Sequence, residues 1–489
     1  MEVLQRTANR GSISTDTGYN LDNSIMFSTE GTYADANSLF YDLMKQSEGF
    51  AAAANAGTNA RKCTVSAWIK RTKITNTSHY DRIFDYRAGG VAFDVYFDPA
   101  TDQLTMYDDN TSMSLKTNRA FRDTSAWYHI VVAVDQTQGT AANRVNVYVN
   151  GVQETSFATE DYGNQNVDLS VFRTDGTSVY VGGAGHEATA YFNGYISEYN
   201  FIDGAQLAPT EFGEFDDDTG IWIPKEFTGS YGTLGHYYNF TVSNDMGKDF
   251  SGNGNDCNNR GDGIANGAAR QATDTPTNNF CTMNPIKGPL ISFVNGTASN
   301  PRIPLMSDGA TVLGNNANTY SYAEATMGVT SGKWYWEMKC TVDANTNVSG
   351  AGIATNINKG FYSTDGTGNF FWHMDGNRYV NGAGTGYGAA WATDDILGFA
   401  YDADNWTLTC YKNNSSQGNV LASQADLSAE IVIPYMYSYG THTYQWNFGG
   451  YHVNSLSSAA SDANGYGSFE YAPPTGYYAL CTKNLAEYG

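Results

Sequence analysis

Charged residues are scarce in this chain of 489 residues: they make up 16% of it, with 27 Lys or Arg against 50 Asp or Glu, for a formal net charge of −23. A protein that binds nucleic acid needs a basic face to neutralise phosphates. The densest basic stretches here are only NARKC (59–63) and IKRTK (69–73). We therefore expect no nucleic-acid partner, because an acidic surface repels other acidic macromolecules.

Long apolar runs are also missing. The first residues, MEVLQRTANRGSIS (1–14), contain no apolar core of a signal peptide. No uninterrupted apolar run is long enough to cross a bilayer. The sequence therefore predicts neither a membrane span nor secretion by a signal peptide.

Cysteines are few and scattered. None of the six is part of a C-x-x-C pair, so the spacing indicates neither a zinc site nor the disulfide framework of a small secreted protein. We expect buried thiols. Cys340 and Cys410, each on a predicted strand, form the one pair whose proximity needs checking.

The abundant residues are 52 Gly, 35 Tyr and 24 Phe, a composition typical of β-sheets joined by tight turns. The stretch NRVNVYVNG (143–151) shows the pattern: valines alternate with polar residues and end at Asn-Gly, which predicts a strand running into a hairpin. Many such short runs follow one another. They predict an all-β protein of antiparallel sandwiches.

The alternation divides the chain into five parts. Residues 1–60 hold few alternations and are either a docking segment or the first strands of the first sandwich. Residues 61–206 form that sandwich, and 207–315 are an irregular, Asn/Gly-rich connector. A second sandwich follows at 316–450. Residues 451–489 are a C-terminal arm.

Four stretches of the first block follow a recognisable order: SAWIKR (66–71), WYHIVVAVD (127–135), RVNVYVNGVQ (144–153) and the long closing stretch from Tyr180 to Phe212. In this order they resemble the laminin-G-like, concanavalin A-type lectin jelly roll. The second block resembles a SPRY domain through SGKWYWEMKC (331–340), GAGIAT (350–355) and ILGFAYDADNWTLTCYKNN (396–414). It departs from that family at Asn413-Asn414, where an Asn-Gly turn is usual.

The order of the parts carries a further resemblance. A laminin-G-like block, the connector stretch NFIDGAQLAPTEFGEFDDDTGIWIPK (200–225), then DTPTNNFCTMNP (274–285), a SPRY-like block and PPTGYYALCTKNL (473–485) together resemble structural proteins of tailed bacteriophages. The resemblance implies a virion surface protein.

Catalytic signatures are weak. Glycoside hydrolases on jelly rolls need two carboxylates across the scissile bond. The nearest match, EFDDDT (214–219), has Thr219 where the second acid should be and lies among turn residues. We interpret it as a solvated acidic loop and expect no enzyme.

Two groups of residues are candidates for binding. Asp249, Ser251, Asn253 and Asn255 alternate as oxygen ligands of Ca²⁺ would, but Arg260 stands where a calcium loop needs its final acid, so a plain turn network is the competing interpretation. The resemblance to lectins implies that glycan-binding loops lie elsewhere. The candidate glycan-binding residues are Tyr107, Asp108, Asp109, Asn110, His186 and Glu187.

The hypothesis from the sequence is thus a fibre or decoration protein on a phage surface, which binds host-surface glycan during adsorption. It would be assembled in the host cytoplasm, contact other capsid or tail proteins and form a homo-oligomer. The alternatives are a purely structural decoration protein and, third, a glycan depolymerase.

Overall fold

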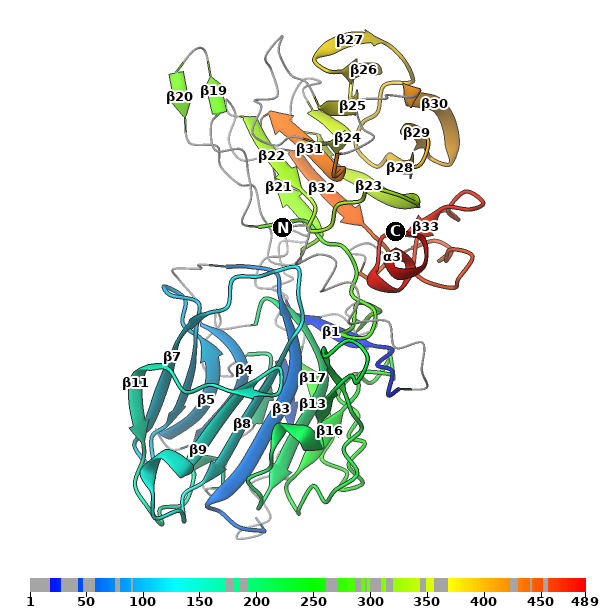
Figure 1. Ribbon diagram of the computed structural model, residues 1–489. Coiled ribbons are helices and arrows are strands. Elements are labelled where there is room, and N and C mark those ends of the chain that lie inside the picture. The colour runs from blue at the N-terminus through cyan, green and yellow to red at the C-terminus, as the bar shows by residue number, and fades with distance from the viewer. Residues whose placement is uncertain are drawn as a thin grey trace. The chain divides into compact units, whose positions relative to one another are not determined.

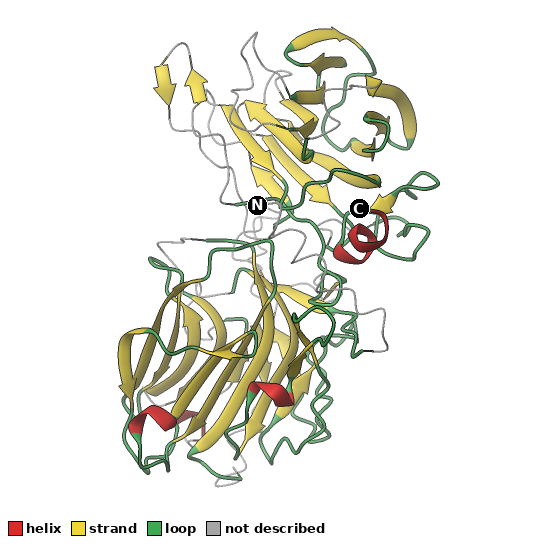
Figure 2. Cartoon of the chain, viewed as in Figure 1, coloured by secondary structure: helices red, strands yellow, loops and turns green. Residues whose placement is uncertain are grey.

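The computed structural model of the chain describes residues 18–27, 43–46, 58–74, 80–88, 91–172, 179–183, 192–260, 271–285, 292–294, 297–299, 309–313, 320–343, 349–355, 368–422, 430–439, 442–451 and 456–489. Regular structure in these ranges is almost entirely strand (Figure 2). The chain divides into two compact units, within residues 14–277 and 278–489, which we call the first and the second sandwich. The expected all-β fold of two antiparallel sandwiches is confirmed.

The first sandwich consists of two sheets of eight described strands each (Figure 1). Sheet one runs in the order β10 (Val152–Gln153), β9 (Val145–Val149), β8 (Tyr128–Asp135), β3 (Lys62–Arg71), β13 (Gly194–Asp203), β1 (Ser24–Phe27), β18 (Gln271–Ala272), and β16 (His236–Tyr238) also pairs with β13. Sheet two runs β11 (Phe157–Tyr162), β7 (Met113–Ala120), β6 (Gln103–Asp108), β5 (Val91–Phe97), β4 (Asp81–Ala88), β12 (Val179–Val181), β2 (Leu43–Gln46), β17 (Cys257–Arg260).

Alternate side chains of both sheets meet in one core. Val65, Ile130 and Val132 come from sheet one, and Phe93 and Met106 come from sheet two. All five are at most 3% exposed. Burying each such side chain contributes roughly 1.5–3 kcal/mol, so the alternation itself determines which face of each strand turns inward.

The hairpin predicted at NRVNVYVNG is confirmed. Asn150 and Gly151 both have positive φ, 48° and 76°, as a type I′ turn requires. Val152 pairs with Val149 across the turn. Two short 3-10 turns, η1 (Ala141–Asn143) and η2 (Ser170–Phe172), lie in other connections of this sandwich.

The described residues between 207 and 277, expected to be irregular connector, instead belong to the first sandwich. They contain η3 (Pro209–Glu211), the hairpin of β14 (Gly213–Phe215) and β15 (Trp222–Pro224), and the strands β16, β17 and β18. Phe212 and Phe227 pack on Val131 and Ile202, which lie on the outer face of sheet one. Isolated aromatic residues give no periodic signal, so the sequence pattern did not show this cover.

The second sandwich also has two sheets. One runs β21 (Thr311–Leu313), β32 (His442–Asn447), β23 (Lys333–Asp343), β28 (Ile396–Asp402), β29 (Thr407–Lys412), β30 (Ser415–Ala422), with β33 (Tyr478–Ala479) parallel to β23. The other runs β22 (Tyr320–Glu324), β31 (Ile433–Tyr439), β24 (Ser349–Ala354), β25 (Asn369–His373), β26 (Asn377–Val380), β27 (Ala383–Gly386). A separate hairpin pairs β19 (Ser292–Val294) with β20 (Thr297–Ser299).

Tryptophans fill the second core: Trp334, Trp336, Trp372 and Trp446 are all at most 1% exposed. The Asn413-Asn414 pair forms the turn between β29 and β30, and Lys412 pairs with Ser415 across it. Asn413 and Asn414 adopt φ of 47° and 67°, so Asn replaces the usual glycine without opening the turn.

The C-terminal arm packs on the outer face of the sheet that contains β23. Phe469, Ala479 and Cys481 form a cluster with Tyr335 and Ala400 of that sheet. The arm ends in a short helix, α3 (Thr482–Tyr488).

Two further expectations from the sequence were buried thiols and the absence of a membrane span. All six thiols are buried and none forms a disulfide. Cys340 on β23 and Cys410 on β29 are separated by β28. Among the described helices, none has the length and apolar character needed to cross a membrane.

Candidate functional site

A row of polar and aromatic side chains crosses sheet two of the first sandwich on the face opposite the core. In the strand register each member lies directly across from the next, in the order Tyr180 on β12, Asp85 on β4, Asp94 on β5, Tyr107 on β6 and Ser114 on β7. Their neighbours along each strand point into the core, as the two-residue period of a strand demands. Five strands thus place one continuous polar row on the outer face.

Arg82 is the cation of this face. Its Nε lies 3.6 Å from Asp85 Oδ1 and 3.8 Å from Asp94 Oδ2. The three charged side chains are at most 3% exposed. Removing charges from water is costly unless they are paired, so the arginine between the two acids explains how both carboxylates can be buried here.

Two tyrosines extend this cluster toward solvent. The Arg82 guanidinium carbon lies 5.1 Å from the centroid of the Tyr80 ring and 5.9 Å from that of Tyr96. The two rings meet edge to face at 5.1 Å. Tyr80 is 39% exposed. The outer face therefore offers an accessible aromatic ring next to a buried cluster of fixed charge.

The sequence carried a signal for these residues. In DRIFDYR (81–87) and VAFDVYF (91–97), polar and aromatic side chains occupy the alternate positions that do not belong to the core. Their pairing could not be predicted, because Asp85 and Asp94 meet only through the register of β4 and β5. The spacing of acids along a single strand, as in 214–219, does not show a pair that two strands bring together.

The predicted glycan loop lies at the end of β6, and its acids serve the fold. Asp108 is buried, and its carboxylate accepts hydrogen bonds from the backbone N–H groups of Thr111 and Ser170, both at 2.8 Å. Burial raises the pKa of the Asp108 carboxyl, although these hydrogen bonds oppose the shift. Asp108 thus joins the turn that follows β6 to the first residue of η2.

Its neighbours are engaged in the same way. Asp109 accepts a hydrogen bond from the backbone N–H of Ala92 and one from the Tyr107 hydroxyl. Asn110 donates through Nδ2 to the carbonyl of Asp168. The structure thus places these predicted residues in one turn and joins Tyr107 to the polar row. His186 and Glu187 lie outside the described residues.

The residues proposed for Ca²⁺ also come together in one loop. Asp249 accepts hydrogen bonds from the backbone N–H groups of Tyr237, Ser251 and Asn255. Asn253 donates through Nδ2 to the Gly235 carbonyl, as Asn255 also does. These contacts are those of a turn network. Within the part of the chain that the structure describes, no three His, Cys, Asp or Glu side chains are placed to share a metal ion.

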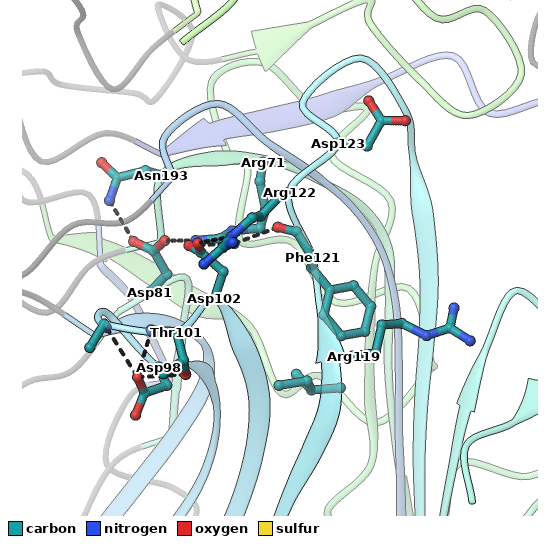
Figure 3. A network of polar contacts seen from close by, with 12 residues as sticks. Arg71, Asp81, Asp98, Thr101, Asp102, Arg119, Phe121, Arg122, Asp123 and Asn193 are labelled. Atoms are coloured by element: carbon teal, nitrogen blue, oxygen red, sulfur yellow. Dashed lines mark hydrogen bonds and ion pairs between the residues drawn. The ribbon is translucent and has the colours of Figure 1, made fainter. Parts of the chain in front are cut away.

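A buried ion-pair network holds one end of the first sandwich together (Figure 3). Arg71 Nη2 lies 2.7 Å from Asp81 Oδ2, and Arg71 Nη1 lies 3.1 Å from Asp102 Oδ1. Nη1 also donates to the Phe121 carbonyl, and Asn193 donates to Asp81. Burial raises the pKa of Asp81, while Arg71 and Asn193 oppose that shift. The arginine ties together four distant segments of chain.

One buried pair has the composition of a catalytic serine and its base. Ser66 Oγ lies 2.9 Å from His129 Nε2. Because Trp222 Nε1–H donates to His129 Nδ1, that nitrogen has no proton, and the neutral imidazole carries its hydrogen on Nε2. Burial lowers the pKa of His129 to about 3. The histidine therefore donates to the serine and cannot accept its proton through Nε2, as a general base must.

The acidic stretch 214–219 forms the tip of the β14–β15 hairpin. Asp216 Oδ1 accepts hydrogen bonds from both the backbone N–H and the hydroxyl of Thr219. Glu214 is exposed, 3.9 Å from Lys225. This is the geometry of a capped, solvated turn.

Comparison with known proteins gives two family matches. Residues 45–210 match the concanavalin A-like lectin/glucanase superfamily, and residues 333–451 match the SPRY domain. The chain therefore contains a lectin-like domain and a SPRY domain, as the sequence resemblance implied. No curated protein matches the chain.

Three solved structures are similar to parts of the chain. The SPRY domain of human HERC1 is 20% identical, with a TM-score of 0.25, and the match covers 28% of this chain and 88% of that one. A heptameric SAP-like pentraxin from Limulus polyphemus is 15% identical, with a TM-score of 0.27, over 38% of this chain and 78% of its own. Another human SPRY domain is 15% identical, with a TM-score of 0.23, over 30% and 94%.

Proposed function

We propose that this chain, which joins a lectin-like sandwich to a SPRY domain, is a phage surface protein that binds host-surface glycan without cleaving it. The observation that carries the proposal is the exposed Tyr80 ring beside Tyr96 and the buried cluster of Arg82, Asp85 and Asp94. An aromatic face can stack on the C–H face of a sugar, and fixed polar groups can orient its hydroxyls. We therefore propose that glycan binds on the outer face of sheet two, and not at the 107–110 turn that the sequence indicated.

Binding is favoured over cleavage by the burial of the two acids. A glycosidase needs a carboxyl that reaches the leaving oxygen of the sugar. Asp85 and Asp94 both face the same guanidinium and are at most 3% exposed, so neither carboxyl is placed to reach a bound sugar. In this proposal, Asp85 and Asp94 hold Arg82 beneath the tyrosines and take no part in glycan hydrolysis.

The virion part of the proposal is supported by the order of the segments along the chain. We propose assembly in the host cytoplasm, contact with other capsid or tail proteins, and a homo-oligomer, in which several weak glycan sites would act together. An antibody against the protein should label intact phage particles. Labelling confined to infected-cell lysate, with clean particles, would contradict this part alone.

Replacing Tyr80 by Ala tests the site. We expect affinity for bacterial envelope polysaccharide to fall about tenfold, because the stacking surface is lost while the buried cluster remains. The matched control is Phe215→Ala. The Phe215 ring is 50% exposed in the same sandwich and packs edge to face on Trp222 of the β14–β15 hairpin, so its removal should leave binding unchanged.

Binding should be measured on an array of such polysaccharides with the full chain, with and without EDTA, while reducing ends are assayed. Loss of binding in EDTA would assign Ca²⁺ to the site. Release of reducing ends would favour the depolymerase instead. Absence of binding to every polysaccharide would leave a decoration protein whose partner is the particle.

A further inference from the structure

Three side chains close a hydrogen-bonded ring on sheet one of the first sandwich. Glu198 lies on β13, Tyr237 on the adjacent β16 (Figure 1), and Tyr19 in the segment that leads into β1. The Tyr19 hydroxyl is 2.7 Å from Glu198 Oε1, the Tyr237 hydroxyl is 2.8 Å from Oε2, and the two hydroxyls are 2.8 Å apart. All three separations are those of O–H···O hydrogen bonds.

The number of protons decides whether this ring can be complete. Three contacts need three hydrogens, and each tyrosine supplies one. If Glu198 is ionised, both hydroxyl protons point at the carboxylate, and the contact between the tyrosines has no hydrogen. If Glu198 is protonated, its own proton completes the ring: the first tyrosine donates to the acid, the acid donates to the second tyrosine, and the second tyrosine donates to the first. The geometry therefore favours the neutral acid.

The surroundings also disfavour the charge. Glu198 is 3% exposed. The charged group that acts on it is a second carboxylate, Glu226, and the Tyr231 ring stacks on that of Tyr237. Burial raises the pKa of Glu198 from 4.5 to about 7, and Glu226 adds to the rise. Burial also raises the pKa of both ring tyrosines well above neutrality, so these stay protonated.

The backbone at Glu198 is held in an unusual conformation. Its φ is 50°, and the pairing of β13 with β3 shifts register between Ser197 and Asn200. A non-glycine residue with positive φ in a strand costs energy, and such strain gathers where a side chain must be aimed. This bulge turns Glu198 toward β16 and the segment around Tyr19.

We propose that Glu198 is a proton-operated latch that holds the segment leading into β1 on the first sandwich. With the acid protonated, the ring is complete and Tyr19 is fixed. When the acid ionises, the Tyr19–Tyr237 contact loses its hydrogen bond and the hold on residues 18–20 weakens. Beyond them the chain stays anchored, because Leu21 exchanges two hydrogen bonds with Thr277 and Ser197 donates to the Asn23 carbonyl.

The direction of the pH effect follows from the linkage rule. The folded protein holds this proton more tightly than the unfolded chain, since the folded-state pKa of Glu198 lies above its usual value of 4.5. The stabilisation is complete below that value and is lost as the pH rises through about 7. The latch is therefore closed in weak acid and open in weak base.

The test is hydrogen exchange of residues 18–20 in the full chain at about pH 5 and about pH 9, corrected for the intrinsic exchange rate. We expect protection to fall roughly tenfold or more across this range in the native protein. In Glu198→Gln, the amide supplies a permanent donor and acceptor in place of the acid, so protection should stay high at both pH values. In Tyr19→Phe, protection should be low at both.

An infrared difference spectrum gives an independent readout. The spectrum of the native protein minus that of Glu198→Gln should contain a protonated carboxyl band that disappears between about pH 6 and pH 8. Burial also raises the pKa of Glu337 to about 7, but the band of Glu337 is common to both proteins and cancels in the difference. Equal protection at both pH values in the native protein, or the same pH dependence in Glu198→Gln, would overturn the proposal. Neither outcome depends on glycan binding, so the latch and the proposed function can fail separately.

Discussion

Replacing Arg71 by Met is expected to lower the free energy of unfolding of the first sandwich by about 3–5 kcal/mol, because two buried carboxylates lose their common cation. The Arg71, Asp81 and Asp102 side chains are at most 3% exposed. Taking the guanidinium away leaves both acids shielded from water, and the Phe121 carbonyl loses its donor as well. Breaking a buried pair from one side costs more than the intact pair contributes.

The matched control for this change is Arg122→Met. Arg122 Nε also contacts Asp102, at 2.8 Å, but its side chain is 55% exposed, so water can replace it and the cost should be at most about 1 kcal/mol. Hydrogen exchange of the β3 and β4 amides in the full chain reports on the first sandwich alone. Similar losses in the two variants would show that Arg71 is no more important than a surface arginine.

Replacing Asp462 by Ala is expected to unfold the C-terminal arm locally, at a cost of about 3–5 kcal/mol in local stability, because the carboxylate joins four groups of the arm itself. Asp462 is 6% exposed and accepts four hydrogen bonds. Three come from the backbone N–H groups of Asn464, Tyr466 and Ala479, and the fourth from Asn484 Nδ2 on α3. Removing the carboxylate leaves the Ala479 and Asn484 donors buried without this acceptor, at a cost of about 1–3 kcal/mol each, whereas the two part-buried backbone donors add less.

The effect should be visible as faster limited proteolysis within residues 456–489. Glu470→Gln is the control. The Glu470 side chain accepts hydrogen bonds only from exposed groups of Ser457 among its described contacts, and its backbone N–H donates to Glu337 whatever the side chain is. An arm that resists protease equally in Asp462→Ala and in native protein would show that the apolar cluster around Phe469 holds it alone.

Much of the architecture was predictable because a strand turns alternate residues to opposite faces. The alternation of Val145, Val147 and Val149, followed by Asn150-Gly151, was enough to predict β9 and its turn, and the structure confirms both. The two sandwich types were predictable through their resemblances, which the family matches confirm. The Asn413-Asn414 turn likewise depends on local chemistry, because Asn adopts the positive φ that this turn needs at both positions.

The candidate site was predictable only in part. Tyr107 was singled out and does lie in the polar row, whereas Asp108 proved to be an anchor of the fold. Arg82, Asp85 and Asp94 were missed, because nothing within one strand shows which residue of another strand lies opposite. The same holds for the 207–277 segment, whose aromatic side chains find their partners on β8 and β13.

By itself, the sequence determined that this protein is made of antiparallel strands, where its tight turns lie and which side chains turn inward, since these depend on neighbours one to four residues away. Only the tertiary structure decided which strands are adjacent and which outer faces are covered. Tyr19 and Glu198 are 179 residues apart in the chain and share a hydrogen bond. Such contacts follow from sheet register and from hydrophobic burial summed over a whole core, and no local pattern records either.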